Sequence, residues 1–173
     1  MSPEGLLDAY RAYLLAARRR SPLTAEVYLR EASLLAGYLA ERGSSPEEAR
    51  SADVLGYLVW RQTGGTAKAP AARPRAPDGA PLSRKTMARV VSSVHAFCKF
   101  MRLEGIRPDD PSELIETPKQ ERSLPSVLAP EEVDRFLASI DQGSPRGLRD
   151  SALFELNYSS VLRISEPASL TID

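Results

Sequence analysis

The residue whose type and setting most clearly indicate chemistry is Arg163, near the end of the 173-residue chain. It stands between Leu162 and Ile164, so its guanidinium is expected to be half-buried, and a half-buried guanidinium needs an anionic partner. One candidate is Glu166, three residues further on, through an ion pair near the start of a helix that Ser165 would cap. The neighbouring residues suggest a second candidate.

Residues 158–170, YSSVLRISEPASL, resemble the segment tyr-x-x-gly-leu-arg-(ile/val)-ser-glu-leu-x-x-leu of the tyrosine recombinases, most closely those of the Xer type. In that family the arginine is the first of two that clamp the scissile DNA phosphate, whose oxygens suit its planar fork. The resemblance implies that Arg163 stabilises charge in the transition state. Two positions depart from the family: Val161 replaces glycine, which strains the backbone if φ is positive there, and Pro167 replaces leucine.

The rest of the family's active site cannot be placed in this sequence. The family also uses a lysine on a β-hairpin, a his-x-x-arg pair, a further histidine or tryptophan, and a tyrosine nucleophile near its C-terminus. The single histidine, His95, lies outside the expected catalytic domain, and all six tyrosines precede the expected nucleophile position. Because strand cleavage needs several groups to converge on one phosphate, we expect this chain alone to bind DNA without cleaving it.

Charge is unevenly distributed along the chain. Residues 1–107 contain 17 lysines and arginines against 10 acidic residues, and residues 108–173 contain 6 against 13, although the net charge is zero. A basic first half is typical of a module that binds a phosphate backbone. No apolar run is long enough to span a membrane, and the single cysteine, Cys98, cannot form an internal disulfide, so a cytoplasmic protein is expected.

Hydrophobic periodicity predicts four helices in the first part of the chain. They run from Glu4 to Arg18, from Thr24 to Gly43, from Asp53 to Gln62 with Ser51 as N-cap, and from a cap at Ser83 to Leu103. Prolines and glycines indicate a flexible insertion at residues 63–82. A tolerated surface loop is the favoured interpretation, and the alternative is a tether to nucleic acid through Lys68, Arg73 and Arg75.

The fourth predicted helix has two contrasting faces. Its apolar stripe consists of Met87, Val90, Val91, Val94, Phe97, Cys98 and Met101. At about 100° per residue the opposite face carries Lys85, Arg89, Ser92 and Ala96, with Lys99 at its margin. Such a face can enter a major groove, because it offers cations for phosphates, short polar groups for base edges and a small residue for close approach. An ordinary solvated helix surface is the alternative interpretation.

The segment that follows this helix also resembles the Xer family, through RPDDP at 107–111, TPK at 117–119 and LP at 124–125. The resemblance implies a core-binding domain at 1–106, a linker at 107–127 and the N-terminal fragment of a catalytic domain at 128–173. The family's second and fourth helices face DNA, so DNA contacts are expected from Thr24, Tyr28, Lys85, Arg89, Ser92 and Lys99. A core position is at least as compatible with Tyr28. His95 is interpreted as a surface or phosphate-proximal side chain, and no metal ligand set is found.

The predicted fold class is therefore mainly α: a four-helix orthogonal core-binding bundle followed by the truncated start of an α/β catalytic domain, represented by helices only. Two or three such helices are expected, among them one beginning with Pro130 at its first position and one over residues 148–156. Without the sheet of that domain, apolar surface should be exposed at Leu148, Leu153, Phe154 and Leu156.

The leading functional hypothesis is site-specific DNA recombination of the Xer kind, which resolves chromosome dimers. It implies double-stranded DNA with an inverted-repeat site as partner, a homo- or hetero-oligomer of recombinase subunits on that DNA, no membrane, and no metal or nucleotide cofactor. A catalytically inactive DNA-binding or partner-binding module is the alternative, favoured by Val161. A helical bundle for protein contacts alone is a third possibility, against which the basic face of the fourth helix argues.

Overall fold

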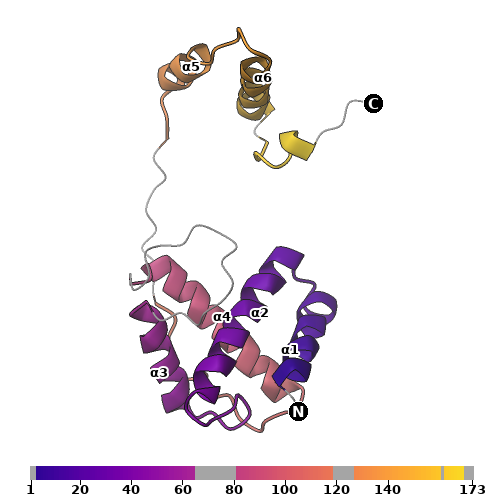
Figure 1. The fold of residues 1–173 in the computed structure, drawn as a ribbon, viewed down its shortest axis with the longest axis vertical. Helices are drawn as coiled ribbons and strands as arrows, with labels where there is room; N and C mark the ends of the chain where they lie inside the picture. Colours follow the sequence, from indigo (N-terminus) through magenta and orange to yellow (C-terminus); the bar gives the residue numbers. More distant parts are fainter. Residues whose placement is uncertain (1–2, 65–80, 119–126, 161, 170–173) are drawn as a thin grey trace. The chain divides into compact units, whose positions relative to one another are not determined.

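The computed structural model describes residues 3–64, 81–118, 127–160 and 162–169. It forms two compact units, Met1–Glu121 and Arg122–Asp173. The described residues form helices and no strand, which confirms the mainly α fold class (Figure 1). In chain order the elements are α1 (Pro3–Ala12), the π-helical turn η1 (Tyr13–Ala17), α2 (Pro22–Ala40), α3 (Ser51–Gln62), α4 (Arg84–Leu103), α5 (Pro130–Ala138), α6 (Pro145–Ser160) and the short 3₁₀ helix η2 (Pro167–Ser169).

The helix ends of the first unit correct two sequence predictions. Helix α2 begins at Pro22, not at Thr24, because proline suits the first helical position and the Ser21 hydroxyl caps the helix, accepting from the Thr24 N–H at 3.3 Å. The N-cap of α3 is Arg50, not Ser51, because the Asp53 carboxylate accepts the Arg50 backbone N–H at 2.8 Å.

Helix α4 begins and ends as predicted. The Ser83 hydroxyl accepts from the backbone N–H of Thr86 at 3.2 Å, which caps the helix as Ser21 caps α2. Beyond its last turn, Gly105 has a φ of 66°, a left-handed conformation that glycine adopts without the steric cost of a Cβ. Between these two points the helix is continuous over 20 residues, Arg84–Leu103.

The apolar stripe of α4 forms the centre of the first unit. All seven residues predicted for that stripe are buried, and Phe97 is completely so. Phe97 and Phe100 lie against Tyr10 of α1, with ring centroids 5.0 Å apart in both pairs. A fully buried aromatic or aliphatic side chain contributes about 1.5–3 kcal/mol through removal from water, so this stripe is a main source of stability.

A buried ion pair joins α2 to α3. The Arg61 guanidinium donates to the Glu31 carboxylate, with Nε 2.8 Å from Oε1 and Nη2 3.1 Å from Oε2, and the Tyr57 hydroxyl donates to the same carboxylate. The rings of Tyr57 and Trp60 also pack on Tyr38, with ring centroids 5.4 and 5.3 Å away, so Trp60 holds the end of α3 against α2. Because both charges are buried, each depends on the other for compensation.

The chain after α4 belongs to the first unit and packs against its core as far as Ile115. The buried Arg107 guanidinium donates to the carbonyls of Pro46 and Ala49, each at 2.9 Å. His95 was expected at the surface or near phosphate, and this was wrong: it is half-buried, with Nε2 2.9 Å from the Ile115 carbonyl and Nδ1 3.4 Å from the Ser112 hydroxyl. Its ring therefore fastens this segment to α4.

The second unit packs far less tightly. Among its described side chains only Ser151 and Pro167 are buried, and the pair Phe136 and Phe154 packs edge to face at 5.0 Å. Leu148, Phe154 and Leu156 are exposed, as predicted, and Leu153 is intermediate. In neither unit do the described residues include a helix that is long and apolar enough to cross a membrane.

Candidate nucleic-acid interface

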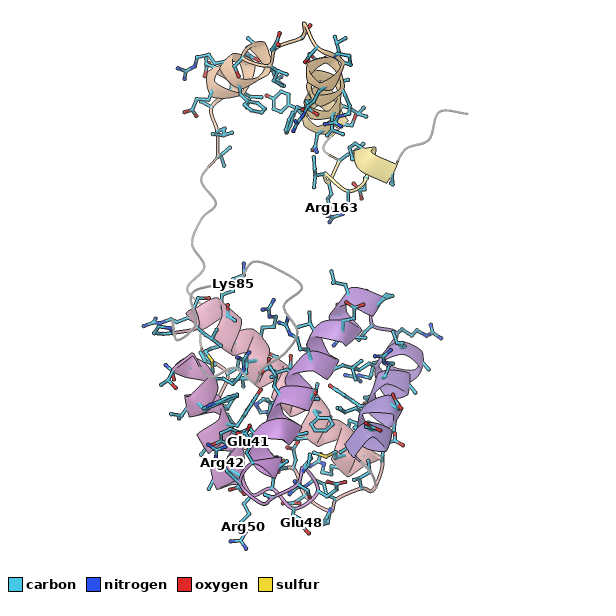
Figure 2. The ribbon with its side chains drawn as sticks, viewed as in Figure 1. Glu41, Arg42, Glu48, Arg50, Lys85 and Arg163 are labelled. Carbon is cyan, nitrogen blue, oxygen red and sulfur yellow. The ribbon has the colours of Figure 1, made fainter. Side chains whose placement is uncertain are left out.

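The outward face of α4 lies opposite its buried stripe, as the periodicity predicts. Lys85, Arg89, Ser92 and Lys99 are exposed, and Ala96 is partly covered. The Ser92 hydroxyl donates to the Ala88 carbonyl at 2.9 Å, so its oxygen is left to accept a hydrogen bond from a ligand. At 1.5 Å per residue the face extends for about 21 Å from Lys85 to Lys99, which is long enough to lie along several phosphates. Lys85 stands at its N-terminal end (Figure 2).

The two α2 residues expected at DNA have different settings. The Thr24 hydroxyl is 2.9 Å from that of Ser21, within the α2 cap. Tyr28 is half-buried and lies close to Ala96 and Lys99 of α4, so α2 and α4 contribute to one site. Lys85, Arg89 and Ser92 do not line that site.

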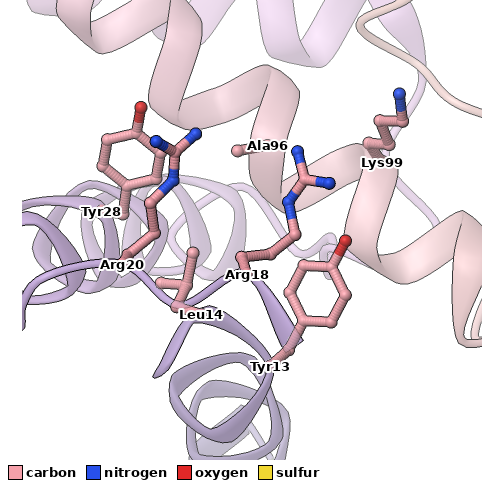
Figure 3. A pocket seen from close by; sticks show the side chains of 7 residues that line it. All are labelled: Tyr13, Leu14, Arg18, Arg20, Tyr28, Ala96 and Lys99. Carbon is pink, nitrogen blue, oxygen red and sulfur yellow. The ribbon is translucent and has the colours of Figure 1, made fainter. Parts of the chain in front are cut away.

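The site shared by α2 and α4 is a small cavity of about 40 Å³, which we call the basic pocket (Figure 3). The side chains that line it come from η1, the turn after it, α2 and α4: Tyr13, Leu14, Arg18, Arg20, Tyr28, Ala96 and Lys99. The guanidinium groups of Arg18 and Arg20 extend toward α4, where Ala96 leaves space. The pocket thus contains three cations and no carboxylate.

The backbone between α1 and α2 explains why these two arginines meet α4. The π-helical turn η1 ends with the Arg18 N–H donating to the Tyr13 carbonyl at 3.0 Å, and the Arg20 N–H donates to the Leu14 carbonyl at 2.9 Å. Arg19 has a φ of 47°, so the chain reverses there. The helical pattern predicts only that the first helix ends at Arg18, and it predicts no DNA contact for Arg18, Arg19 or Arg20. Three consecutive cations before a predicted DNA-facing helix were the signal that could have identified them.

The electrostatics of the pocket favour an anion. Within the described parts of the chain, no ion pair is formed by Arg18, Arg20 or Lys99. The buried hydroxyl of Tyr10 also has no hydrogen-bond partner in the described part of the chain. Burial raises the pKa of Tyr10, which interacts electrostatically with Tyr28 and Arg20, so this hydroxyl stays protonated beside the pocket.

Arg163 belongs to the second unit, just before η2. Its side chain is 85 % exposed, so the expectation of a half-buried guanidinium was wrong (Figure 2). The Glu166 carboxylate holds this segment in place, because its Oε2 accepts the Arg163 backbone N–H at 2.7 Å and its Oε1 lies 3.6 Å from Nη1. Solvent exposure leaves the guanidinium fork accessible to an anionic ligand. Val161, which the sequence analysis questioned, lies outside the described residues, as do Lys68, Arg73 and Arg75.

The chemistry available at these sites is that of cations and hydroxyls. No group of three or more histidine, cysteine or acidic side chains that could hold a metal ion occurs in the part of the chain that the structure describes. The basic pocket and the α4 face offer guanidinium, ammonium and hydroxyl groups, which bind phosphate oxygens. Arg163 offers one further guanidinium in the second unit.

Comparison with known proteins places this arrangement in a family. Residues 7–105 match the family described as "Phage integrase, N-terminal SAM-like domain". The chain is 30 % identical to tyrosine recombinase XerD of Listeria monocytogenes serotype 4b and 32 % identical to XerD of Neisseria meningitidis serogroup B, over 97 % and 96 % of its length. It is 31 % identical, over 98 % of its length, to tyrosine recombinase XerC of Mycobacterium bovis.

These alignments cover 52 %, 51 % and 53 % of the three relatives, so the chain spans about half the length of the curated relatives it matches. The matched residues 7–105 include α2, α4 and all of the basic pocket, together with nearly the whole predicted core-binding domain. The chain therefore belongs to the phage-integrase family of tyrosine recombinases, of the Xer type, and carries that family's N-terminal SAM-like domain.

Proposed function

We propose that this chain binds double-stranded DNA through α2 and α4 of its first unit and takes part in site-specific DNA recombination. The observation that carries the proposal is the face of α4, where cations and a hydroxyl are exposed opposite a completely buried stripe. A helix held rigidly by its apolar face can present its other face to a groove without a large loss of conformational entropy on binding. The similarity to recombinases supports DNA as the ligand of this face.

Two kinds of DNA contact follow from the residue types in this region. Lys85, Arg89 and Lys99 suit phosphate oxygens, while Ser92 is short enough to reach a base edge from a helix in the major groove. Thr24 and Tyr28 are the proposed DNA contacts of α2. The Thr24 hydroxyl lies in the cap at the start of that helix, and the Tyr28 side chain lines the basic pocket. These six residues are the DNA-binding set of the proposal.

Arg163 is proposed as the first catalytic arginine of a recombinase active site. Its guanidinium would bind two oxygens of the scissile phosphate and stabilise the charge that develops as a tyrosine oxygen attacks the phosphorus and the 5′ oxygen departs. The attacking tyrosine, the proton donor and the second arginine are absent from this sequence by the family's pattern. The 173-residue chain is therefore proposed to bind DNA but not to cleave it.

The finer role proposed is that of Xer recombinases in resolving chromosome dimers. It comprises an inverted-repeat site on double-stranded DNA, recombinase subunits assembled on paired sites as homo- or hetero-oligomers, and a cytoplasmic location. No metal or nucleotide cofactor is included, because the energy of the cleaved phosphodiester is retained in a phosphotyrosine bond. The boundaries 1–106, 107–127 and 128–173 remain the proposed division into core-binding domain, linker and catalytic fragment.

A catalytically inactive DNA-binding or partner-binding module is the second proposal. The observation that favours it is the second unit, whose described apolar side chains other than Pro167 are not buried and whose Arg163 is engaged only by Glu166 among the contacts described. Such a chain would occupy a recombination site, or pair with a complete recombinase, without chemistry of its own.

DNA binding is tested by fluorescence anisotropy of a labelled inverted-repeat duplex and of a scrambled duplex at several salt concentrations. We expect tighter binding to the inverted repeat and an affinity that falls steeply with salt, because each neutralised phosphate releases counterions. The variant Lys85→Ala/Arg89→Ala should weaken binding. Unchanged affinity of that variant would contradict the assigned interface and favour a bundle for protein contacts.

Cleavage is tested separately with a nicked suicide duplex, which traps a covalent phosphotyrosine adduct. We expect no adduct from this chain, as judged by denaturing gel electrophoresis. A covalent protein–DNA species that a phosphodiesterase removes would overturn the proposal that the chain alone is inactive.

A further inference from the structure

We propose that the basic pocket holds one phosphate of the DNA backbone, so that Arg18, Arg20 and Lys99 together serve a single contact. This inference rests on the proposed DNA binding and assigns a role to the pocket within it. The pocket would fix the position of α4 along the duplex, while the more distant part of the α4 face makes its own contacts.

The charge arrangement is the first argument. Three cations share one pocket, their side chains form no ion pair among the described residues, and no acidic residue lines the site. Like charges held together repel, and a single phosphate placed between them would attract all three cations and offset part of this repulsion. A guanidinium also matches two oxygens of one phosphate, so two arginines and a lysine can saturate that group.

Size is the second argument. A cavity needs roughly 10–15 Å³ of this kind of volume for one water molecule, so about 40 Å³ accommodates a group with a few oxygens and excludes a base or a whole nucleotide. The Tyr13 ring cannot move away easily to widen the pocket, because it packs against the rings of Tyr10 and Phe100, with ring centroids 6.5 and 5.1 Å away. The pocket therefore suits a phosphate that projects from a longer polymer.

Rigidity is the third argument. The backbone hydrogen bonds of Arg18 and Arg20 to Tyr13 and Leu14 fix where both arginine side chains begin. Lys99 stands on α4, in a helix whose opposite side is buried. Only side-chain freedom is lost when a phosphate enters, which lowers the entropic cost of the contact.

The number of phosphates can be measured from the salt dependence of DNA binding by the full 173-residue chain. The logarithm of the binding constant falls with the logarithm of salt concentration with a slope of about −0.9 for each phosphate neutralised on B-DNA. The test compares the wild type with Arg18→Ala/Arg20→Ala/Lys99→Ala on a short duplex of random sequence. A charge-matched control is Arg11→Ala/Arg30→Ala/Arg50→Ala, which removes three exposed arginines that do not line the pocket.

If the three cations share one phosphate, the slope for Arg18→Ala/Arg20→Ala/Lys99→Ala should be less negative than that of the wild type by about 0.9. The slope of the control should change by less. A loss of about 2.7 would overturn the inference, because each cation would then have its own phosphate. An unchanged slope, or an equal loss in the control, would also overturn it. A wild type with no salt-dependent binding at all would instead refute the proposed DNA-binding function.

A second arm separates backbone phosphate from free phosphate. Inorganic phosphate is added to both proteins and thermal unfolding is followed by circular dichroism, which also reports whether the pocket variant is folded. We expect at most a small rise in the wild-type Tm, because one free anion lacks the other contacts that a duplex makes. A large rise in the wild type alone, combined with an unchanged DNA salt slope, would assign the pocket to free phosphate and overturn the inference.

Discussion

The two units of the chain differ in how they bury their apolar residues. In the first unit the apolar residues of the helices form one buried core, and even the ion pair between Glu31 and Arg61 is buried. In the second unit the described apolar side chains of α5 and α6 are partly or largely exposed, including Phe136 and Phe154. The first unit thus has a core of its own, whereas the second unit exposes apolar surface that another protein could cover.

Truncating one aromatic ring in each unit should give the largest contrast. Phe97→Ala empties a completely buried site and is expected to lower the free energy of unfolding of the first unit by about 3–5 kcal/mol. Phe154→Ala removes a ring that is 37 % exposed, so its effect should be much smaller. Urea denaturation followed by circular dichroism measures both changes. Equal losses would contradict the difference in packing between the units.

The buried ion pair provides the next test of the first unit. Arg61→Ala leaves the Glu31 carboxylate buried without its main compensating charge, and the expected cost is about 3–5 kcal/mol. The control is Arg102→Ala, whose pair with Glu113 is exposed at 3.8 Å and should contribute at most about 1 kcal/mol. If both variants unfold at the same urea concentration, the buried pair does not stabilise the fold.

Alkaline pH should destabilise the first unit. Burial raises the pKa of Tyr10 and of Tyr57, and it raises the pKa of Cys98 from 9.0 to about 12. These groups stay neutral in the folded state while the unfolded chain ionises, so their contribution is present below about pH 9 and is lost as pH rises. The free energy of unfolding should then fall by up to about 1.4 kcal/mol per pH unit for each group.

The thiol part of this pH dependence can be isolated with Cys98→Ala. Because the unfolded thiol ionises before the tyrosines, this variant should flatten the decline just above pH 9 and leave the steeper decline at higher pH. Chemical denaturation at a series of pH values measures both proteins. An identical pH dependence in wild type and variant would show that the Cys98 thiol does not stay neutral in the folded state.

The helix caps predict a smaller effect. Ser83→Ala removes the acceptor of the Thr86 N–H and should cost about 1 kcal/mol, and Ser21→Ala should cost a similar amount through the Thr24 N–H. Ser139→Ala in the second unit is a control, because its hydroxyl bonds to the Phe136 carbonyl at the end of α5 and caps no N-terminus. If neither cap variant lowers the free energy of unfolding of the first unit, the assigned caps are wrong.

Local patterns predicted much of the first unit. The periodicity of α4 predicted seven of the ten residues that this helix buries, and the exposed face opposite them, because a single helix imposes both. Ala88, Ser93 and Phe100 are also buried and were not predicted. The predicted start of α4 at the Ser83 cap and its end before Gly105 are also confirmed, since a helix cap depends on a few neighbouring residues. The cap at Ser21 was missed because Thr24 offers the same hydroxyl three positions later.

Contacts between distant residues were not predictable in the same way. His95 bonds to Ile115, 20 residues on, and Arg61 pairs with Glu31, 30 residues back, at spacings that no local pattern encodes. The basic pocket depends on a π-helical turn and on a reversal at Arg19, which bring two arginines to α4. Such turns depend on tertiary packing, so periodicity does not reveal them.

The smallest effect on stability is expected from Arg163, although its proposed chemical role is the greatest. Arg163→Ala should change the unfolding free energy of either unit by less than about 1 kcal/mol, because the side chain is 85 % exposed and its pair with Glu166 is at the surface. Glu166→Ala should cost more, since it removes the acceptor of the Arg163 backbone N–H. Denaturant unfolding measures both variants. A clear loss of stability in Arg163→Ala alone would favour a structural role for this arginine over a phosphate-binding one.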